Sequence, residues 1–291
     1  MKLIKQSFEI LDQQCGLEGI YKQIEIAGRT CYKSEDKITE DSAKGFVDRM
    51  IKSGHGAMLE HGSIYLQFKS IVHCFGKGYQ GGLKYLSNPY SKVVLSEKET
   101  TQYVTTNYRV LIENNWLDDL KYLCEPTSFH EKRITVKFIC DRGVSHEFVR
   151  HRVFSFAQES TRYCNYTKDK FNNELTFIIP CWFEWDEQTI HQGDFEKSGS
   201  GSEDSGLYIN SLLNTEQCYK YLIKEGWKPQ EARGVLPNAL KTELVMTGFV
   251  SDWEHFFRVR SRIAETGKTH PQAQELAHSL HEAFIQRGLV K

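Results

Sequence analysis

The stretch from Arg150 to Tyr163 carries the residue types best suited to chemistry. It opens with Arg150-His151-Arg152 and contains two phenylalanines, so we expect it to contact the core. A guanidinium group keeps its charge at ordinary pH, and a buried one needs an anionic partner. The nearby carboxylates in the sequence are Glu147 and Glu159, which leaves the local charge positive. An anion from outside the chain, such as a phosphate, would balance it.

Two side chains could act as nucleophiles, Ser160 and Cys181. His151 could serve Ser160 as a base, but the G-x-S-x-G turn of serine hydrolases is missing around this serine. Its place between Glu159 and Arg162 favours a phosphate ligand instead. Cys181 has apolar neighbours and no base beside it. We therefore interpret it as a buried strand cysteine rather than an activated thiol.

The segment from His55 to His61 combines two histidines with Glu60, and these residue types can bind a metal ion. No third histidine follows at ligand spacing, which favours a loop whose histidines are held by hydrogen bonds. The eight cysteines include no C-x-x-C pair. We therefore predict no metal site, and free thiols in a reducing compartment.

Length and charge limit the class of protein. A chain of 291 residues suits one large domain or two small ones. The net charge of −1 provides no general basic field for nucleic acid. No apolar run is long enough for a signal peptide or a membrane span, so we predict a soluble, cytoplasmic protein.

Hydrophobic periodicity predicts a mixture of helices and strands, an α+β fold. Apolar and polar residues alternate from Ser63 to Lys69 and from Arg133 to Cys140, the pattern of half-buried strands. Ser145 suits a helix N-cap, so we expect the Arg150 segment to begin inside a helix. Further helices are predicted over residues 39–53, about 207–225 and 252–260. Two more are predicted to start at 229, running through 237 and onward, and at about 271, running at least to 284.

Arg260 stands out among the later arginines. It follows Phe256 by four residues and Trp253 by seven, so it belongs to the edge of an apolar helix face. An arginine at the edge of a buried aromatic face can hydrogen-bond a planar heterocycle and stabilise negative charge that develops on it. Arg233 is a second isolated arginine, within the segment Glu231 to Pro237.

Together these segments resemble the signature of the flavin-dependent thymidylate synthases. The core of the resemblance is Arg150-His151-Arg152 followed, after seven residues, by Ser160, and Thr161-Arg162-Tyr163 extends it. Further segments that occur in the family's order are Glu60-His61, Ser145-His146-Glu147, Ala232 to Pro237, and His255 to Arg260. The resemblance covers roughly residues 20 to 285. It implies a single catalytic domain over residues 1–291, with surface excursions near 70–130 and 184–206 that are longer than in compact members.

The resemblance implies an activity and an architecture. Members of the family are homotetramers with a central mixed or antiparallel sheet flanked by helices and active sites where subunits meet. They bind FAD, take electrons from NADPH and a one-carbon unit from methylenetetrahydrofolate, and methylate dUMP to dTMP. The expected partners are therefore dUMP, folate and NADPH, without nucleic acid or membrane. Reduced flavin supplies the hydride, so no cysteine nucleophile is required.

The resemblance also assigns residues by position. It implies that Arg260 is the catalytic arginine that activates the uracil ring. The residues that it implies for FAD are His55, Ala57, Arg150, His151, Arg152, Gln158 and His255. The residues that it implies for dUMP are Glu147, Arg150, Gln158, Ser160, Thr161, Arg162, Arg233 and Arg260. The Arg150 segment would thus have a flavin side, 150–152, and a nucleotide side, 158–162, at hydride-transfer distance.

Two departures from the family pattern bear on the cofactor. Some members have glutamate where Gln158 stands, which leaves this segment more positive. An Asn-x-Arg flavin contact of some members aligns with Phe249 and Ser251, so those contacts are in question. Two other interpretations stay open. The basic stretch could bind single-stranded RNA, with Phe154, Phe156 and Tyr163 as stacking platforms, or it could form only a subunit interface.

Overall fold

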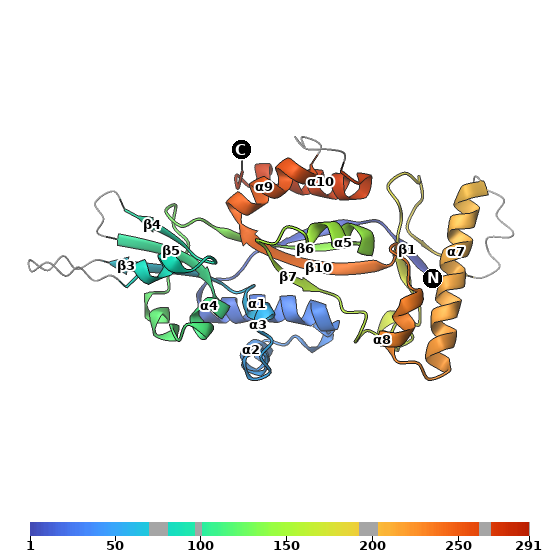
Figure 1. Cartoon of the computed structure of the whole chain (residues 1–291), viewed down its shortest axis with the longest axis horizontal. Helices are drawn as coiled ribbons and strands as arrows, with labels where there is room; N and C mark the ends of the chain where they lie inside the picture. Colours follow the sequence, from blue (N-terminus) through green and yellow to red (C-terminus); the bar gives the residue numbers. More distant parts are fainter. Residues whose placement is uncertain (70–80, 97–100, 192–202, 262–268, 291) are drawn as a thin grey trace, which may run out of the picture.

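A four-stranded antiparallel sheet crosses the centre of the molecule in the order β2-β6-β10-β7 (Figure 1). The computed structural model describes residues 1–69, 81–96, 101–191, 203–261 and 269–290. The strands of the central sheet are β2 (Ser7–Leu11), β6 (Arg133–Asp141), β10 (Lys241–Phe249) and β7 (Ser155–Gln158). The short strand β7 belongs to the Arg150 segment, so this segment is anchored on the central sheet.

Two three-stranded sheets flank the central one. In the first, strands pair in the order β3-β5-β4, and in the second in the order β8-β1-β9. The first consists of β3 (Ser63–Lys69), β5 (Thr101–Asn107) and β4 (Lys92–Leu95). The second consists of β8 (Thr176–Ile178), β1 (Lys2–Ile4) and β9 (Gln188–Thr189).

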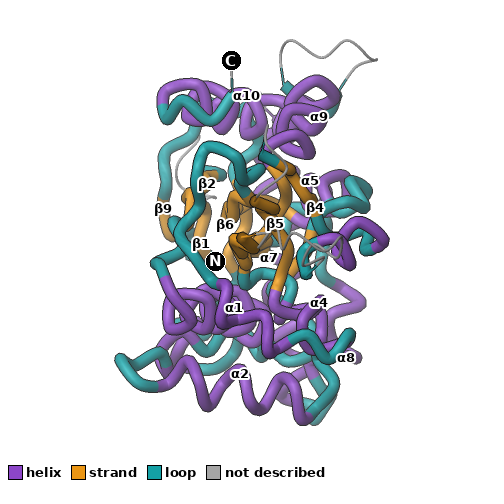
Figure 2. Tube along the Cα trace, turned by 90° about the vertical axis from the view of Figure 1, so that its left-hand side faces the viewer, coloured by secondary structure: helices purple, strands orange, loops and turns teal. Residues whose placement is uncertain are grey.

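Helices cover the central sheet on both sides (Figures 1 and 2). On one side lie α1 (Gly16–Tyr32), α2 (Ser42–Lys52) and α3 (Gly56–Leu59). On the other lie α5 (Arg142–Phe148), α9 (Val250–Arg260) and α10 (Pro271–Gln286). The remaining helices are α4 (Tyr108–Glu113), α7 (Glu203–Lys224) and α8 (Pro229–Ala232). Short 3-10 turns occur at Glu35–Lys37, Leu83–Ser87, Leu117–Tyr122, Asp169–Phe171 and Arg233–Val235.

The aromatic face of α9 is buried against the sheet, as its spacing predicted. Trp253, Phe256 and Phe257 are fully buried in a cluster with residues of β6, β10 and α10. Trp253 also donates from Nε1 to the carbonyl oxygen of Ile134, 3.1 Å away. Arg260 is the last residue of α9 and lies at the edge of this cluster. The packed helix therefore holds the backbone that carries the Arg260 side chain.

The α+β fold with a central antiparallel sheet and flanking helices is confirmed, as are both predicted strands, although β3 is buried on both faces from Ser63 to Leu66 rather than half-buried. The predicted helix start at Ser145 is wrong. Asp141 caps α5 instead, because its carboxylate accepts from the backbone N–H of Val144 at 2.6 Å. The helix ends at Phe148, so Arg150 lies in the turn that follows it.

The prediction for residues after 229 is also corrected. Pro229 starts a helix as expected, but α8 ends at Ala232 and β10 follows at Lys241–Phe249. The expected excursions fall partly on residues 70–80, 97–100 and 192–202, which lie outside the described residues. Residues 203–206, predicted to belong to the second excursion, form the start of α7. In the described part of the chain, no helix is long and apolar enough to cross a membrane.

Candidate functional site

Arg260 is held by three contacts where the ends of α5 and α9 meet. Its Nη1 forms an ion pair with the Glu147 carboxylate, and its Nη2 donates to the Glu147 carbonyl oxygen at 3.2 Å. Its Nε donates to Nε2 of His151 at 3.1 Å. A guanidinium group has five N–H donors, so about two remain for another molecule. The contacts therefore fix the plane of the guanidinium group and leave N–H donors available to a ligand.

His151 accepts that hydrogen bond because its ring is neutral. Burial lowers the pKa of His151 to about 4, and the positive charges of Arg260 and His255 act in the same direction. Since Nε2 accepts, the ring proton belongs on Nδ1. His255 lies beside it on α9, with a ring-centroid distance of 6.3 Å, and is exposed. The structure therefore brings four of the predicted residues, Glu147, His151, His255 and Arg260, into one cluster.

A second cluster follows β7, where the chain turns beneath the end of α1. The backbone N–H of Ser160 donates to the carbonyl oxygen of Cys31 at 3.0 Å. The Arg233 Nη1 donates to the hydroxyl of Thr161 at 3.4 Å, across 72 positions of sequence. Arg162 is exposed, and its guanidinium lies 5.5 Å from the ring centre of Tyr163. These residues gather hydroxyl and cationic groups, which are the usual ligands of a phosphate.

Gln158 connects the two clusters. Its Nε2 donates to the hydroxyl of Ser145 at 2.8 Å and to that of Thr242 at 3.2 Å. Ser145 belongs to α5, two residues before Glu147, and Thr242 belongs to β10. Gln158 itself ends β7, so it joins the helix that carries Glu147 to the loop that carries Ser160.

His55 reaches the second cluster through Tyr32. The Tyr32 hydroxyl and Nδ1 of His55 are 2.8 Å apart, and the Tyr32 ring lies 5.6 Å from that of Tyr163. Ala57, in α3, is exposed close by in the sequence. Sequence reasoning did not assign Tyr32, although it follows the conspicuous segment Gly28-Arg29-Thr30-Cys31.

The two clusters are formed by segments that precede and follow β7 in the sequence, and Gln158 at the end of β7 contacts α5 of the first cluster. Arg150 and Arg152, predicted to lie on the flavin side, are both exposed and have no carboxylate partner in the described part of the chain. The sequence left open whether these arginines are buried, and the structure places both at the surface. They are available to a ligand or to another subunit.

A buried ionic network lies under the second cluster and was not predicted. The carboxylate of Glu159 accepts from Lys241 Nζ at 2.9 Å and from the Tyr166 hydroxyl at 3.0 Å. Glu243 pairs with Lys241, with Lys33 at 2.7 Å and with Lys137 at 2.6 Å. Burial opposes its ionisation, but the three lysine charges hold the pKa of Glu243 well below its usual range.

The two histidines that the sequence suggested as possible metal ligands lie apart. His61 is fully buried, with Nδ1 2.8 Å from the Thr247 hydroxyl, and does not meet the exposed His55. Among the described residues, no group of three or more His, Cys, Asp or Glu side chains could hold a metal ion.

Cys181 is exposed rather than buried in a strand, because β8 ends at Ile178. Burial and the neighbouring Glu275 raise the pKa of its thiol, so it is not activated.

The fold and the site define an α+β protein that gathers arginine, histidine and hydroxyl groups at its central sheet, as proteins that bind anionic nucleotides do. The chain belongs to the thymidylate synthase complementing protein family, whose model matches residues 91–287, more than half of its length.

Individual relatives support the same assignment. A flavin-dependent thymidylate synthase of Corynebacterium efficiens is 34% identical over 245 residues, which are 82% of this chain and 66% of the relative. One of Pyrococcus furiosus is 32% identical over 121 residues, which are 42% of this chain. That match covers 43% of the Pyrococcus protein, less than half its length.

One solved structure covers nearly the whole chain. A UMP/dUMP methylase from Streptomyces cacaoi, bound with 5-Br UMP, aligns over 98% of this chain and 92% of its own. The TM-score is 0.45 and the sequence identity 15%. At this level the similarity adds nothing to the family assignment.

Proposed function

We propose that this protein is a flavin-dependent thymidylate synthase that methylates dUMP to dTMP. Electrons would come from NADPH through bound FAD, and the one-carbon unit from methylenetetrahydrofolate. The observation that carries the proposal is the Arg260 guanidinium, fixed by Glu147 and His151 next to the Arg150 segment. Family membership and the names of the relatives support the same reaction.

Arg260 would activate the nucleotide. Carbon 5 of uracil becomes a better nucleophile when negative charge is stabilised on the ring, and a fixed cation lowers the cost of that charge. Because Glu147 and neutral His151 already orient the guanidinium, little reorganisation is needed when the ring arrives. The two N–H groups that remain would contact the uracil.

The loop after β7 would hold the phosphate of dUMP. Ser160, Thr161 and Arg162 would be its ligands, with Arg233 added from the turn after α8. The contact between Arg233 and Thr161 supports this assignment, because it places a cation from a distant segment at the loop. Gln158 would orient the nucleotide from its position between both clusters.

FAD would be held mainly by Arg150, His151 and Arg152, with His55, Ala57, Gln158 and His255. The residues fit an anionic dinucleotide, because Arg150 and Arg152 have no carboxylate partner in the described part of the chain. Arg152 lines a cavity of about 410 Å³ that borders β10 and α9. When bound, FAD would supply the hydride for the reaction.

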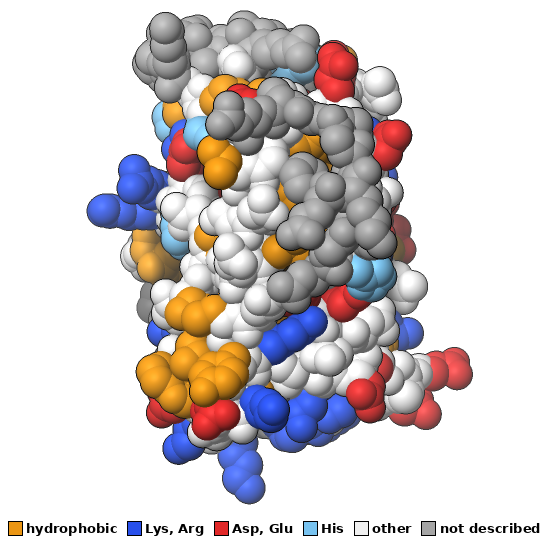
Figure 3. Space-filling view, turned by 90° about the vertical axis from the view of Figure 1, so that its right-hand side faces the viewer, with side chains coloured by type: hydrophobic (Ala, Val, Ile, Leu, Met, Phe, Trp, Pro, Cys, Tyr) orange, Lys and Arg blue, Asp and Glu red, His pale blue; other side chains and the backbone are white. Residues whose placement is uncertain are grey.

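We further propose that the protein acts as a cytoplasmic homotetramer of single catalytic domains, with sites completed between subunits. Large apolar side chains are exposed on and beside α7, among them Leu207, Tyr221 and Trp227. Figure 3 shows the face that includes α7, where apolar side chains gather next to lysine and arginine. Exposed apolar patches of this kind mark protein contacts.

The replacement of Arg260 by alanine tests the proposed function. We expect the purified protein to be yellow, and Arg260→Ala to lower dTMP formation about a thousandfold while FAD absorbance is retained. Arg287→Ala is a matched control, because Arg287 pairs with Asp12 at the end of α10, away from both clusters. Wild-type protein that stays colourless with added FAD, or that forms no dTMP, would refute the proposal. Salt-sensitive binding to single-stranded RNA without a flavin spectrum would favour the RNA-binding alternative.

A further inference from the structure

In the part of the chain that the structure describes, Arg133 at the start of β6 is a buried arginine without a carboxylate within ion-pair distance. The residue is 8% exposed. Its Nη1 donates to the Glu60 carbonyl oxygen at 2.9 Å and to the Ser63 hydroxyl at 3.4 Å, and its Nη2 to the Ser155 hydroxyl at 3.3 Å. All of these partners are neutral. Burial lowers the pKa of Arg133 to about 10, and the nearby charges of Glu60 and Asp252 offset this effect only in part.

Arg133 borders a cavity whose positive charges exceed its available negative ones. The cavity of about 410 Å³ is also lined by Glu60, Lys92, Arg152 and Asp252, together with Phe249. The Glu60 carboxylate pairs with Arg109 at 2.6 Å, outside the cavity lining. The Asp252 carboxylate accepts from the backbone N–H of Phe249 at 3.0 Å, as the cap of α9. In the described residues, no carboxylate lies within ion-pair distance of Arg133 or Arg152.

Cations converge on Phe249 and Ser251, the positions where the family's Asn-x-Arg flavin contact is missing. The Lys92 ammonium forms an ion pair with Glu131 at 2.7 Å, donates to the Ser251 hydroxyl at 2.7 Å and lies 4.5 Å from the centre of the Phe249 ring. The Arg133 guanidinium lies 5.7 Å from the same ring centre. Lys92 comes from β4 and Arg133 from β6, so neither can be found by inspecting the sequence around residue 250. Both positive charges are brought to this place by the fold.

We propose that Arg133, Lys92 and Phe249 form a subsite for the adenosine diphosphate half of a dinucleotide cofactor. The inference rests on the proposed function and extends it to residues that the family pattern does not assign. The two cations would replace the arginine that is absent at Ser251 and contact the diphosphate, with Arg152 beside them. Phe249 provides an aromatic surface for the adenine ring.

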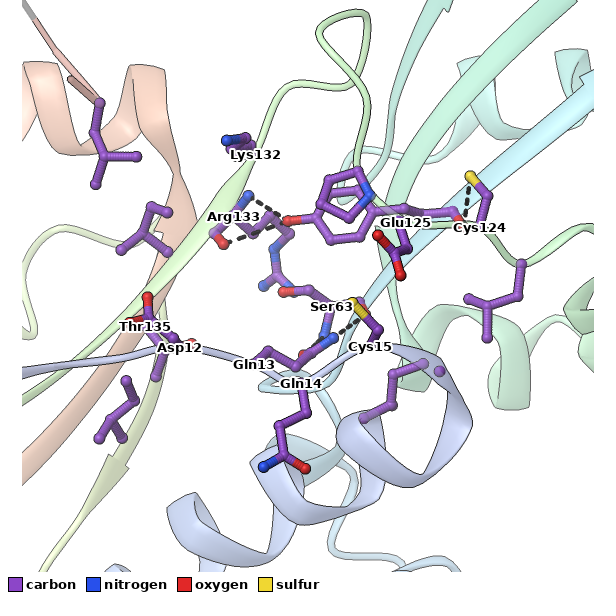
Figure 4. Close-up of a pocket in the computed structure, with 18 of the residues that line it drawn as sticks. Asp12, Gln13, Gln14, Cys15, Ser63, Cys124, Glu125, Lys132, Arg133 and Thr135 are labelled. Carbon is purple, nitrogen blue, oxygen red and sulfur yellow. Dashed lines mark hydrogen bonds between the residues drawn. The ribbon is translucent and has the colours of Figure 1, made fainter. Parts of the chain in front are cut away.

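The neighbouring larger cavity is a less suitable anion site. It has a volume of about 520 Å³ and is lined by Asp12, Gln13, Cys15, Glu125 and Lys132, among others (Figure 4). Arg133 also borders it, but two of its three hydrogen-bond partners, Glu60 and Ser155, line the smaller cavity. A hydrogen bond with Glu125 raises the pKa of the Cys15 thiol, and Asp12 adds a second carboxylate to the lining of this cavity.

Both FAD and NADPH contain adenosine diphosphate, and the experiment distinguishes them. Affinities for FAD and riboflavin are measured by flavin fluorescence in the wild type and in Arg133→Gln and Lys92→Met, and the KM for NADPH by steady-state kinetics. If the subsite serves FAD, both variants bind FAD about tenfold more weakly. Their affinity for riboflavin, which lacks the diphosphate, stays within about twofold. If it serves NADPH, the KM for NADPH rises about tenfold instead while FAD affinity is kept.

Two matched controls separate this role from a general loss of structure. Arg29→Gln removes another buried arginine, which pairs with Glu25 at 2.9 Å in α1. Lys132→Met removes an exposed cation that lines only the larger cavity. Both should keep the wild-type ratio of FAD to riboflavin affinity.

The outcomes are separable. Folded variants with an unchanged ratio and an unchanged KM for NADPH would overturn the subsite but leave the proposed function intact. If Arg133→Gln does not fold, Lys92→Met decides alone, because Lys92 is partly exposed. A wild-type protein that binds neither flavin would refute the proposed function itself.

Discussion

At the scale of single residues, His61 gives the clearest pH dependence. Burial lowers the pKa of His61 from its ordinary 6.5 to about 3, and the positive charge of Arg133 adds to this effect. Its Nδ1 meets the Thr247 hydroxyl at 2.8 Å, and Thr247 meets the Thr135 hydroxyl at 2.8 Å. The neutral ring thus joins the end of α3 to β10 and β6 through hydroxyl groups.

We predict that His61→Gln reduces the acid sensitivity of the fold. Between pH 6.5 and pH 3 the unfolded chain binds a proton at this histidine and the folded chain does not, so stability falls as pH falls. From pH 6.5 to pH 4.5 this loss amounts to about 2–3 kcal/mol, and the variant should lose that much less. Urea unfolding at both pH values measures the difference. His146→Gln, a change at an exposed histidine, is the control and should lose as much stability between the two pH values as the wild type. The same loss in His61→Gln would contradict the prediction.

The position of the buried uncompensated arginine could not be obtained from the sequence. The physical rule that such an arginine calls for an anion was sound, but it was applied to Arg150 and Arg152, which are exposed. Arg133 resembles the polar first residue of an alternating strand. Its burial depends on Glu60, Ser63 and Ser155, which lie 22 or more residues away.

At the scale of elements, the loop after β7 is held by the ionic network below it. Glu159 precedes Ser160 directly and is almost fully buried against Lys241 and Tyr166. Its backbone N–H donates to the carbonyl oxygen of Glu243 at 2.8 Å, so the loop is joined to β10 by both backbone and side chain. These bonds make Glu159 a positioning residue for the proposed phosphate ligands.

We predict that Glu159→Gln raises the KM for dUMP about tenfold with a much smaller change in kcat, because the phosphate ligands lose their fixed position. Asp119→Asn is the matched control. Asp119 is also buried and accepts from a tyrosine hydroxyl (Tyr85, 2.8 Å) and a lysine (Lys84, 2.6 Å), but in another part of the fold. Both variants should lose about 1–3 kcal/mol of stability. Equal KM values for dUMP in the two would show that Glu159 serves stability alone.

Elements whose sequence has a clear period were predictable, and β10, whose sequence has none, was not. β3 and β6 alternate apolar and polar residues, and α9 and α10 show helical spacing, so all four were found. β10 has buried residues at nearly every position, including Thr242, Glu243 and Thr247, so its sequence has no period of two. A strand that is covered on both faces cannot be distinguished from a helix segment by periodicity. The partners of Glu243 on β6 and α1 became visible only in three dimensions.

At the scale of the whole molecule, the main feature is that the candidate site residues form two clusters within the chain. Arg260, Glu147 and His151 belong to one and Ser160 to Arg162 to the other, with exposed arginines in the segments of both. A site that needs both sets around one nucleotide could draw them from two chains. The sequence assigned the residues to two ligands, but it contained no information on which chain supplies which set.

We predict that two inactive variants restore each other when their subunits are mixed. The residues lost in Arg260→Ala and in Arg162→Ala belong to different clusters. If two chains each supply one cluster to a site, about a quarter of the sites in hybrid oligomers would contain both intact residues. The mixture, denatured and refolded together, should recover about that fraction of wild-type dTMP formation. Arg260→Ala mixed with Glu147→Ala is the control, because Arg260 and Glu147 touch within one chain and no hybrid site can be intact. Failure of the first mixture to regain activity, although both variants fold and bind FAD, would place each complete site within a single chain.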